Sequence, residues 1–502
     1  MTNPRYVYSG NQVREMDREA VAGPEVSGWE LMERAGRSAF ALLIETWQEA
    51  GKLQVICGTG NNGGDGWVVA RLAREAGWQV AVELIGDKNR IEGDAQRALQ
   101  AYEASGGAFN ARVADQPVPE LDADILVDAL CGTGATGPLR AGHIAWVEAM
   151  NSSGIPIVAM DVPTGLNADT GQPEPVATRA AVTVTFIAEK KGLVTGSAGD
   201  FVGRLRLEAL DLPVSIPNSK APAARISHWP ELIGHLPPRG IAHHKGLSGH
   251  VLVIGGNTGL SGAGILAAKA ALRSGAGLVS LATRPATAQA AVTAQPEIMA
   301  HAIDEVAQLR SLLKGATCVV IGPGLGKDSW ARMCLTAVLE HTVVTVFDAD
   351  ALNLLASGDP ECLRARQHIL TPHPGEAARL LGLSNAAVVS DRFQALQQLV
   401  ERWQGICVLK GHGTLVGGPG QMTRVCPYGN PGMATAGMGD VLAGLLGSLL
   451  AQGLEPFTAA ELAVSAHGIA GDRAAREGLR GLLASDVIDG LREVLAGHGI
   501  DQ

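Results

Sequence analysis

Short runs of apolar, largely β-branched residues recur along the chain between longer amphipathic segments. In the first half they occupy residues 53–57, 125–129, 156–160 and 182–186. In the second half they begin at His250, Gly277, Cys318, Thr342, His368 and Ile406. Continuous apolar runs that alternate with helical patterns are typical of parallel strands covered by helices on both faces. The pattern predicts doubly wound α/β architecture in both halves.

A chain of 502 residues is longer than one hydrophobic core usually serves. Prolines at positions 213, 217, 222, 230, 237 and 238 interrupt any long element between the two series of strands. We therefore expect a first domain over residues 1–215 and a second over 225–502. The Gly-rich loops of the two halves do not align with one another, so no internal repeat is predicted.

The formal net charge of -10, without a cluster of Lys and Arg, argues against a nucleic-acid binder. The seven cysteines form no CxxC pair, which indicates neither a disulfide framework nor a zinc site. The first residues lack the pattern of a signal peptide, and the most apolar later stretch, 438–454, contains Asp440 and is shorter than the ~20 apolar residues of a membrane span. We expect a cytoplasmic protein that binds neither nucleic acid nor membrane.

The stretch 58–66 reads GTGNNGGDG and stands between a predicted strand and a helical segment that starts at Trp67. Glycines let a ligand approach the backbone, and a helix N-terminus presents free N–H groups to an anion. The sequence therefore predicts phosphate or ribose binding here, although an ordinary surface turn is an alternative.

A Rossmann dehydrogenase is a second alternative, because Gly58, Gly60 and Gly63 satisfy GxGxxG. Glu83 is the only acidic candidate near the next strand, and its spacing is loose. The polar Asn61, Asn62 and Asp65 also fit this interpretation poorly.

Two further loops follow strand ends, where ligands of open α/β sheets gather. Asp128 precedes CGTGATGP, and Asp161 begins DVPTGLNADTG. Asp128, Thr164 and the Asn62 amide offer the oxygen ligands that a monovalent or divalent cation requires. Each aspartate could instead cap a helix or turn.

Four segments of the first half resemble the NAD(P)H-hydrate epimerase family: NNGGDG at 61–66, DALCGTGATG at 128–137, DVPTGL at 161–166 and TFIAEKKGL at 185–193. The resemblance implies a Rossmann-like three-layer domain. It places substrate on Asn61, Asn62, Gly63, Gly64, Asp65, Gly132, Thr133, Gly134, Ala135, Thr136, Gly137, Pro138 and Asp161. It places potassium on Asn62, Asp128 and Thr164, and Thr164 keeps the hydroxyl of the more common Ser.

Epimerisation moves a proton on and off the hydrate, so an acid/base group is needed. Asp161 is the first candidate and Lys190 the second, with a solvated charge at a strand end as the alternative role for Lys190. Cys131 stands where an aromatic residue is usual in the family. We expect it to be a small buried hydrophobe.

In the second half, Gly437, Met438, Gly439 and Asp440 precede a long apolar helix. Backbone N–H groups at such a turn can hold a transferring phosphoryl group, and a carboxylate there can accept the proton of an attacking hydroxyl. A simple N-cap role for Asp440 is the alternative.

Several other segments surround this one in the sequence. They are KGLSGHVLVIGG at 245–256, GPGLG at 322–326, DADALN at 348–353, TPHPGE at 371–376 and KGHGT at 410–414. Together with NPGMATAGMGDVLAG at 430–444, they resemble the ribokinase-like, ADP-dependent NAD(P)H-hydrate dehydratases over nearly the whole second half. The resemblance implies a C-terminal ribokinase-like α/β domain.

This second resemblance also implies site residues and a mechanism. It places the hydrated cofactor on Ala263, Gly324, His373 and Asp440, and the adenine nucleotide on Lys410, Gly411, His412, Gly413, Thr414 and Gly439. Asp440 would deprotonate the ring hydroxyl, the hydroxyl would take phosphate from ADP, and the ring nitrogen would expel the phosphate. Mg2+ would neutralise the nucleotide's charge.

Both resemblances together predict a bifunctional repair enzyme for hydrated NADH and NADPH (NADHX and NADPHX), which acts as a homo-oligomer. A ribokinase-like kinase of another small molecule is an alternative, because the same groups serve any hydroxyl phosphorylation. In a further alternative the N-terminal domain is only a binding module. The sequence leaves open whether ADP or ATP, and NADHX or NADPHX, is preferred.

Overall fold

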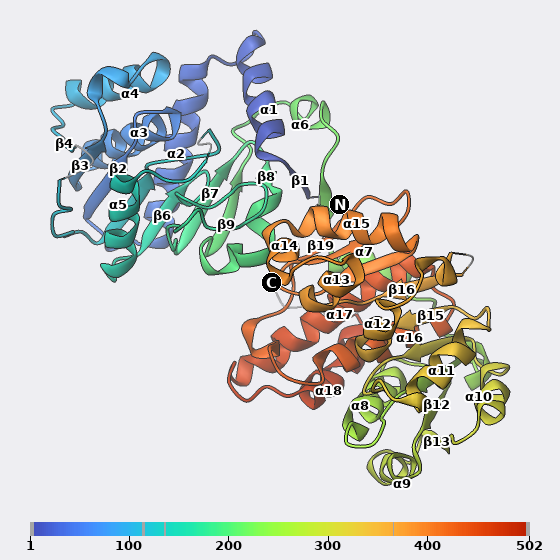
Figure 1. The fold of residues 1–502 in the computed structure, drawn as a ribbon. Coiled ribbons are helices and arrows are strands. Elements are labelled where there is room, and N and C mark those ends of the chain that lie inside the picture. Colours follow the sequence, from blue (N-terminus) through green and yellow to red (C-terminus); the bar gives the residue numbers. More distant parts are fainter. Residues whose placement is uncertain (1–4, 113–115, 135–136, 365, 498–502) are drawn as a thin grey trace. The chain divides into compact units, whose positions relative to one another are not determined.

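The computed structural model describes residues 5–112, 116–134, 137–364 and 366–497. The chain divides into two compact units, Tyr6–Ala224 and Arg225–Gln502. Figure 1 shows the first unit in blue to green and the second in green to red. The division falls inside the proline-rich segment between the two series of strands.

A parallel sheet forms the centre of the N-terminal unit. Its strands lie in the order β4 (Asn110–Arg112), β3 (Gln79–Ile85), β2 (Lys52–Cys57), β5 (Ile125–Ala129), β6 (Ile157–Met160), β7 (Val182–Phe186) and β9 (Arg204–Glu208). The four predicted strands of this half are all present. A short parallel pair, β1 (Tyr6–Tyr8) with β8 (Glu189–Lys190), places Tyr8 opposite Lys190.

Helices cover both faces of this sheet (Figure 1), which confirms the doubly wound prediction. The helices are α1 (Gly10–Ala22), α2 (Gly28–Thr46), α3 (Asn61–Glu75), α4 (Gly93–Ala104), α5 (Ala141–Ser152) and the short α6 (Ser215–Asn218). Val55 and Val127 belong to the core on the side of α2, α3 and α4. Ile56 and Leu126 pack with Trp146 of α5 on the other side. The alternation explains why each strand is apolar along its whole length.

Helix α3 begins at Asn61, so the NNGGDG segment forms its first turns and does not precede the helix as a loop. Tertiary contacts override the poor helix propensity of these glycines. A Cβ on Gly63 would clash with the carbonyl oxygen of Gly58, and one on Gly66 would lie 2.5 Å from the Cβ of Ala129. Glycine therefore allows α3 to lie directly against the ends of β2 and β5.

The sheet of the C-terminal unit is longer. Its order is β13 (Met299–Ala302), β12 (Leu278–Thr283), β11 (His250–Ile254), β14 (Cys318–Ile321), β15 (Thr345–Phe347), β16 (His368–Leu370), β17 (Ile406–Leu409), β18 (Thr414–Gly417), β19 (Arg424–Cys426) and β10 (Ala224–Ile226). The strands from β13 to β17 are parallel, whereas β18 is antiparallel to both of its neighbours. Only the short segment 410–413 joins β17 to β18, and a connection of that length permits only antiparallel pairing.

The helices of this unit are α7 (Trp229–Leu232), α8 (Ser261–Arg273), α9 (Pro285–Ala294), α10 (Val306–Leu313), α11 (Ser329–Leu339), α12 (Ala349–Leu355), α13 (Pro374–Leu381), α14 (Asn385–Ser390), α15 (Arg392–Trp403), α16 (Met438–Ala451), α17 (Pro456–Ala474) and α18 (Ala484–Leu495). Helix α16 lies in the core between α8 and the sheet. A Cβ on Gly444 would clash with the carbonyl oxygen of Ala267, and one on Gly447 would clash with Val320.

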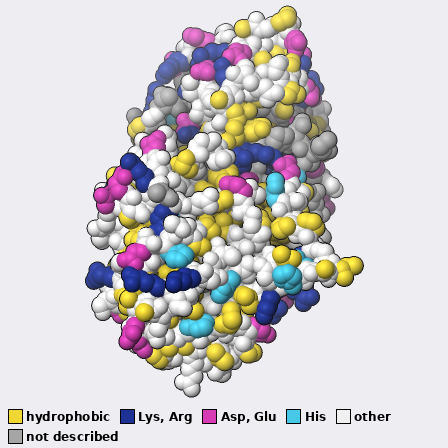
Figure 2. Space-filling view, turned by 90° about the vertical axis from the view of Figure 1, so that its right-hand side faces the viewer, with side chains coloured by type: hydrophobic (Ala, Val, Ile, Leu, Met, Phe, Trp, Pro, Cys, Tyr) yellow, Lys and Arg dark blue, Asp and Glu magenta, His cyan; other side chains and the backbone are white. Residues whose placement is uncertain are grey.

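Charged side chains of both signs lie on the surface. On the face in Figure 2, basic and acidic side chains are interspersed, without a broad basic area. Within the described residues, no helix combines the length and the apolar character needed to cross a bilayer.

Candidate active sites

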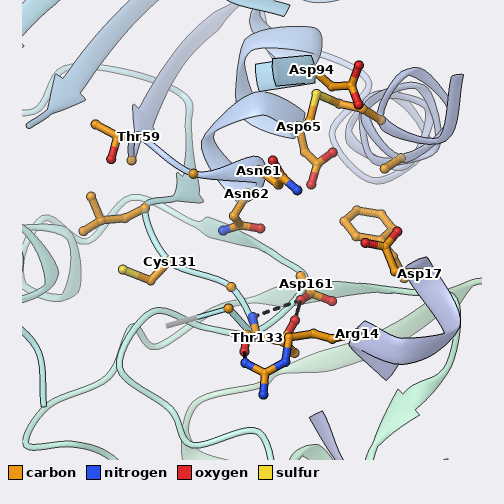
Figure 3. A pocket seen from close by; sticks show the side chains of 18 of the residues that line it. Arg14, Asp17, Thr59, Asn61, Asn62, Asp65, Asp94, Cys131, Thr133 and Asp161 are labelled. Carbon is orange, nitrogen blue, oxygen red and sulfur yellow. Dashed lines mark hydrogen bonds between the residues drawn. The ribbon is translucent and has the colours of Figure 1, made fainter. Parts of the chain in front are cut away.

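A cavity of about 1070 Å³ opens at the carboxyl ends of the strands in the N-terminal unit. Its wall includes the predicted residues Asn61, Asn62, Asp65, Gly132, Thr133, Gly134, Gly137, Pro138, Asp161 and Lys190. Gly63 and Gly64 are buried against Gly58 and Met32, where they seat α3. Ala135 and Thr136 lie outside the described residues. The structure thus gathers side chains from segments far apart in the sequence (Figure 3).

Asp161 and Lys190 form a buried ion pair in the wall of this cavity. Lys190 is 0 % exposed, and its ammonium group also donates to Thr185 Oγ1 and to the Phe186 carbonyl, both at 2.9 Å. The alternative of a solvated strand-end lysine is therefore wrong. Asp161 accepts from the backbone N and the hydroxyl of Thr133 at 3.2 and 3.0 Å. Its φ of 65° is unusual for a residue with a side chain and is typical of functional sites.

The pKa values of the carboxylates in this cavity are shifted in opposite directions. Burial alone would raise the pKa of Asp161, but the Lys190 charge and the hydrogen bonds from Thr133 outweigh it and lower the pKa. Burial raises the pKa of Asp65 well above its ordinary value, and the negative charges of Asp161 and Asp17 raise it further. Burial and Asp161 also raise the pKa of Asp17. Asp17, on α1, lines the cavity and was not among the predicted site residues.

The predicted potassium ligands meet beside this cavity. Asp128 is completely buried, and its two carboxylate oxygens accept from Thr164, from the hydroxyl at 2.7 Å and from the backbone N at 2.8 Å. Asp128 thus ties the loop after β6 to the end of strand β5 and is not a helix cap. The Thr164 hydroxyl also lies 3.3 Å from the Cys131 carbonyl oxygen.

The Asn62 amide differs from the other two predicted ligands in its hydrogen bonding. Among the described residues, neither its Oδ1 nor its Nδ2 has a hydrogen-bond partner, although both atoms are buried. A Cβ on Gly132 would lie 3.1 Å from Asn62 Oδ1, so the amide faces the loop after β5. A buried polar atom without a partner is costly. The available donors are amide, carboxylate, hydroxyl and carbonyl oxygens, and hard cations prefer such ligands.

Two other predictions concern residues near this site. Glu83 forms an ion pair with Arg112 at 2.6 Å and accepts a hydrogen bond from Asn110 at 2.9 Å. These contacts occupy the carboxylate that a Rossmann dehydrogenase would use to bind ribose. Cys131 is only partly buried and lines the cavity, with its sulfur 3.9 Å from His143 Nδ1. Burial raises the pKa of Cys131 to about 12, so it remains a thiol.

In the C-terminal unit, Asp440 lies in the first turn of α16. The N-cap is Gly437, whose φ of 92° is in the left-handed region, so the interpretation of Asp440 as a simple N-cap is wrong. Burial, followed by the charge of Asp348, raises the pKa of Asp440 to about 7, although Lys410 opposes the shift. A carboxylate with that pKa is suited to accept a proton near neutral pH.

Lys410 lies beside the same turn and is held by two carboxylates. Its Nζ is 2.8 Å from Asp348 Oδ1 and 3.8 Å from Glu376 Oε2. A Cβ on Gly439 would lie 3.2 Å from this Nζ. Asp348 also accepts from the Thr371 hydroxyl at 2.7 Å. Asp348 and Glu376 belong to the DADALN and TPHPGE segments, but no role was predicted for either residue. Their positions could have indicated one, because Asp348 directly follows a strand and Glu376 lies at the start of a helix.

His373 joins this cluster through Glu376. It is the N-cap of α13, its Nδ1 accepts from the Gly375 backbone N at 2.9 Å, and its Nε2 lies 3.5 Å from Glu376 Oε1. The side chain is 51 % exposed, so a ligand can reach it. Burial lowers the pKa of His373, and the charge of Lys410 lowers it further.

The remaining predicted residues form two groups. A Cβ on Gly324 would lie 3.0 Å from the Ala263 Cβ, so these two residues are neighbours. In the 410–414 turn, Gly411 and Gly413 have φ values of 134° and 56°, and the Thr414 hydroxyl donates to the Gly411 carbonyl at 2.7 Å. His412 is exposed at the tip of this turn.

Two family models match the chain. Residues 251–493 match the model described as NAD(P)H-hydrate dehydratase, and residues 28–192 match the model of the YjeF-related protein N-terminus. Among solved structures, an ADP/ATP-dependent NAD(P)H-hydrate dehydratase from Bacillus subtilis, co-crystallised with ATP and Mg2+, is 28% identical. It covers 54% of this chain and 97% of its own, with a TM-score of 0.50.

Curated relatives match both units at once. The bifunctional NAD(P)H-hydrate repair enzyme Nnr of Coxiella burnetii is 46% identical, over 97% of this chain and 98% of its own length. The enzyme of the same name from Escherichia coli is 40% identical, over 98% of this chain and 94% of its own. Because these matches span both units, this chain belongs to the family of bifunctional NAD(P)H-hydrate repair enzymes.

Proposed function

We propose that the N-terminal domain, residues 1–215, interconverts the R and S epimers of NADHX and NADPHX. The C-terminal domain, residues 225–502, then removes water from the S epimer at the expense of ADP, with release of AMP and phosphate. The observation that carries this proposal is the arrangement around Asp440. A carboxylate with a pKa of about 7 lies in the first turn of a helix, beside the lysine that two other carboxylates hold.

In the dehydration, Asp440 takes the proton of the ring hydroxyl while this oxygen forms a bond to the terminal phosphorus of ADP. The bond from that phosphorus to the bridging oxygen breaks, and AMP leaves. The N–H groups at the start of α16 and the Lys410 ammonium stabilise the negative charge on the transferred group. Phosphorylation turns a poor leaving group into a good one, and the ring nitrogen's lone pair then expels phosphate with formation of a C=N bond. Loss of a proton from the adjacent ring carbon to solvent returns these electrons to nitrogen and forms the ring C=C bond of NAD(P)H.

Mg2+ would neutralise negative charge on the nucleotide phosphates. The part of the chain that the structure describes contains no group of three or more His, Cys, Asp or Glu side chains arranged for a metal. Phosphate oxygens and waters would therefore be the principal ligands of the ion. Lys410 to Thr414 and Gly439 would bind the rest of the nucleotide, and Ala263, Gly324 and His373 the hydrated cofactor.

In the epimerisation, the segments 61–65 and 132–138 hold the substrate, and Asp161 contacts it. Potassium would be held by Asn62, Asp128 and Thr164, and the unpartnered Asn62 amide supports this assignment. The ion would orient the two loops that form the cavity wall. Lys190 keeps Asp161 ionised, which suits a base.

We also propose a cytoplasmic homo-oligomer. The seven cysteines are free thiols, as expected in a reducing compartment. Ile241 and Leu247 are exposed apolar side chains that a second copy would cover. Light scattering on the purified protein measures the number of subunits.

The test uses the purified full-length protein, ADP, Mg2+ and an R/S mixture of NADHX. We expect complete recovery of the NADH absorbance, together with one AMP and one phosphate for each NADH. Recovery of only the S fraction would show that epimerisation is absent. A stable phosphorylated product would favour the alternative of a small-molecule kinase. A parallel series with ATP and with NADPHX measures the preferences.

A further inference from the structure

Two carboxylates of the N-terminal cavity differ in what surrounds them. Figure 3 shows Asp65 on α3 and Asp161 after β6, both directed toward the space between these segments. Asp161 is held by Lys190 and by both donors of Thr133. For Asp65, which is partly buried, no hydrogen bond or ion pair to another described residue is found. One carboxylate is thus held as an ion, and the other is available to a ligand.

The packing of α3 determines where Asp65 points. Gly64 packs against Met32, while Gly63 and Gly66 lie against the loop after β2 and against Ala129. Because of these contacts, positions 63, 64 and 66 have no room for a side chain. The Asp65 side chain, like those of Asn61 and Asn62 in the same turns, lines the cavity. Its direction is therefore fixed by the backbone of the helix and does not depend on a flexible loop.

The charges around Asp65 favour its protonated form. Asp17 on α1 and Asp161 after β6 act against ionisation, and Lys190 on β8 acts for it. Lys190 is already paired with Asp161, so its charge is largely compensated. Other charged residues in the cavity wall are Arg14, Arg18, Asp87, Arg90, Asp94 and Arg140. Burial adds to the effect of the two aspartates and raises the pKa of Asp65 well above its ordinary value.

We propose that Asp65 is the general acid of the epimerase reaction and that Asp161 is its partner base. This inference rests on the proposed epimerase function of the same cavity. A pair of carboxylates whose surroundings favour opposite protonation states is the arrangement that acid/base catalysis at neutral pH requires.

The proposed step is balanced within the substrate and one water. Asp65 gives its proton to the hydroxyl of the hydrated carbon, and the C–O bond breaks so that the oxygen leaves as water with the electron pair. The ring nitrogen's lone pair forms a C=N bond. Water then adds to the opposite face of that carbon, the C=N electrons return to nitrogen, and Asp161 takes the proton from the added water. The proton returns from Asp161 to Asp65 through solvent, and no redox partner is needed.

The test compares full-length wild type with Asp65→Asn on separated R and S epimers of NADHX. We expect the kcat of R-to-S conversion to fall by about 10²- to 10⁴-fold, the usual contribution of a general acid, with little change in KM. Consumption of the S epimer with ADP reports on the other unit and should match wild type. Glu75→Gln, at the last turn of the same helix, is the matched control and should epimerise normally.

The pH profile separates a proton donor from a merely structural residue. Wild-type kcat for epimerisation should fall as pH rises through the elevated pKa of Asp65, Asp65→Glu should retain this alkaline limb, and Asp65→Asn should lose it. An Asp65→Asn enzyme with the wild-type rate and profile would overturn the inference. If the wild type itself leaves the R epimer unchanged, the proposed epimerase function fails instead.

Discussion

The Lys410 ammonium lies 2.8 Å from the Asp348 carboxylate, and Asp348 is only 1 % exposed. Burial alone would lower the pKa of Lys410, but Asp348 and Glu376 outweigh it and raise the pKa. The lysine is therefore charged and positioned before any nucleotide binds. Such preorganisation is worth more in a water-poor site than in solvent.

Replacement of Lys410 by Met should remove this charge from the nucleotide site. We expect kcat/KM for ADP in the dehydration to fall by about 10²- to 10³-fold, the cost of one lost stabilising donor. Steady-state kinetics on the S epimer measures the effect, and Lys314→Met, at an exposed position, is the control. An unchanged kcat/KM would mean that Lys410 does not contact the nucleotide.

The rate of dehydration should depend on the ionisation of Asp440. Asp440 is the proposed base, which must be deprotonated to work, and its pKa is raised to about 7. We therefore expect kcat to increase tenfold per pH unit below about pH 7 and to level off above it. Burial is the main cause of this value, and the charges of Asp348, Lys410, Asp350 and Glu376 around the group contribute to it. A profile that is flat over about two pH units on either side of this pKa would contradict the assignment of Asp440 as the base.

Asp440→Asn should inactivate the dehydratase and yet stabilise the C-terminal unit at high pH. The pKa of Asp440 is higher in the folded state, at about 7, than its ordinary value of 3.8, so ionisation destabilises the folded state as pH rises from the lower value to the higher. The Tm of the variant should therefore exceed that of wild type above neutral pH and equal it in acid, below both values. Calorimetry at the two pH extremes checks the sign. Equal Tm values under both conditions would contradict it.

Lys190→Met should leave Asp161 as a buried carboxylate without its counter-ion. Breaking a buried pair in this way typically costs about 3–5 kcal/mol, and the pKa of Asp161 should rise because its largest stabilising charge is lost. We expect slow epimerisation at neutral pH and a lower free energy of unfolding of the N-terminal unit in denaturant titrations. Lys191→Met changes the next residue, which is not part of the ion pair, and serves as the control. Wild-type epimerisation would show that the pair has only a structural role.

Potassium should stabilise the N-terminal unit. A ligand that binds only the folded state raises Tm, and the effect grows with the logarithm of its concentration above Kd. Melting in KCl should therefore occur at a higher temperature than in choline chloride at equal ionic strength. Asn62→Ala should abolish this difference because it removes the unpartnered amide oxygen. Asn11→Ala is the control, since Asn11 bonds with an exposed Glu15. A K+ effect that survives Asn62→Ala would place the ion elsewhere.

The fold was largely predictable because buried parallel strands are apolar along their whole length. The run at 125–129 coincides with β5, and the run at 53–57 differs from β2 by one residue. The start of α3 was not predictable from propensity, since only the contacts of Gly63 and Gly66 with distant backbone make a helix favourable there. The antiparallel β18 was also missed, because its four residues carry no clear period.

The residues of the sites were predictable from motifs, but their ion pairs and protonation states were not. Asp348 and Lys410 are separated by 62 positions, and nothing in either motif indicates that they form a pair. The protonation of Asp65 likewise depends on Asp17, Asp161 and Lys190, which come from three other segments. Charge states depend on distances that only the folded chain defines.

The contact between Gly444 and the Ala267 carbonyl has a consequence for how such enzymes can diverge. Gly444 lies one turn after Asp440 on α16, and the contact at this point is between two main chains. No exchange of side chains on α8 can make room for even a methyl group at position 444. Substitutions in the loops can therefore change the wall of the site, whereas the main-chain contact at Gly444 keeps the start of α16, and with it Asp440, at a fixed position.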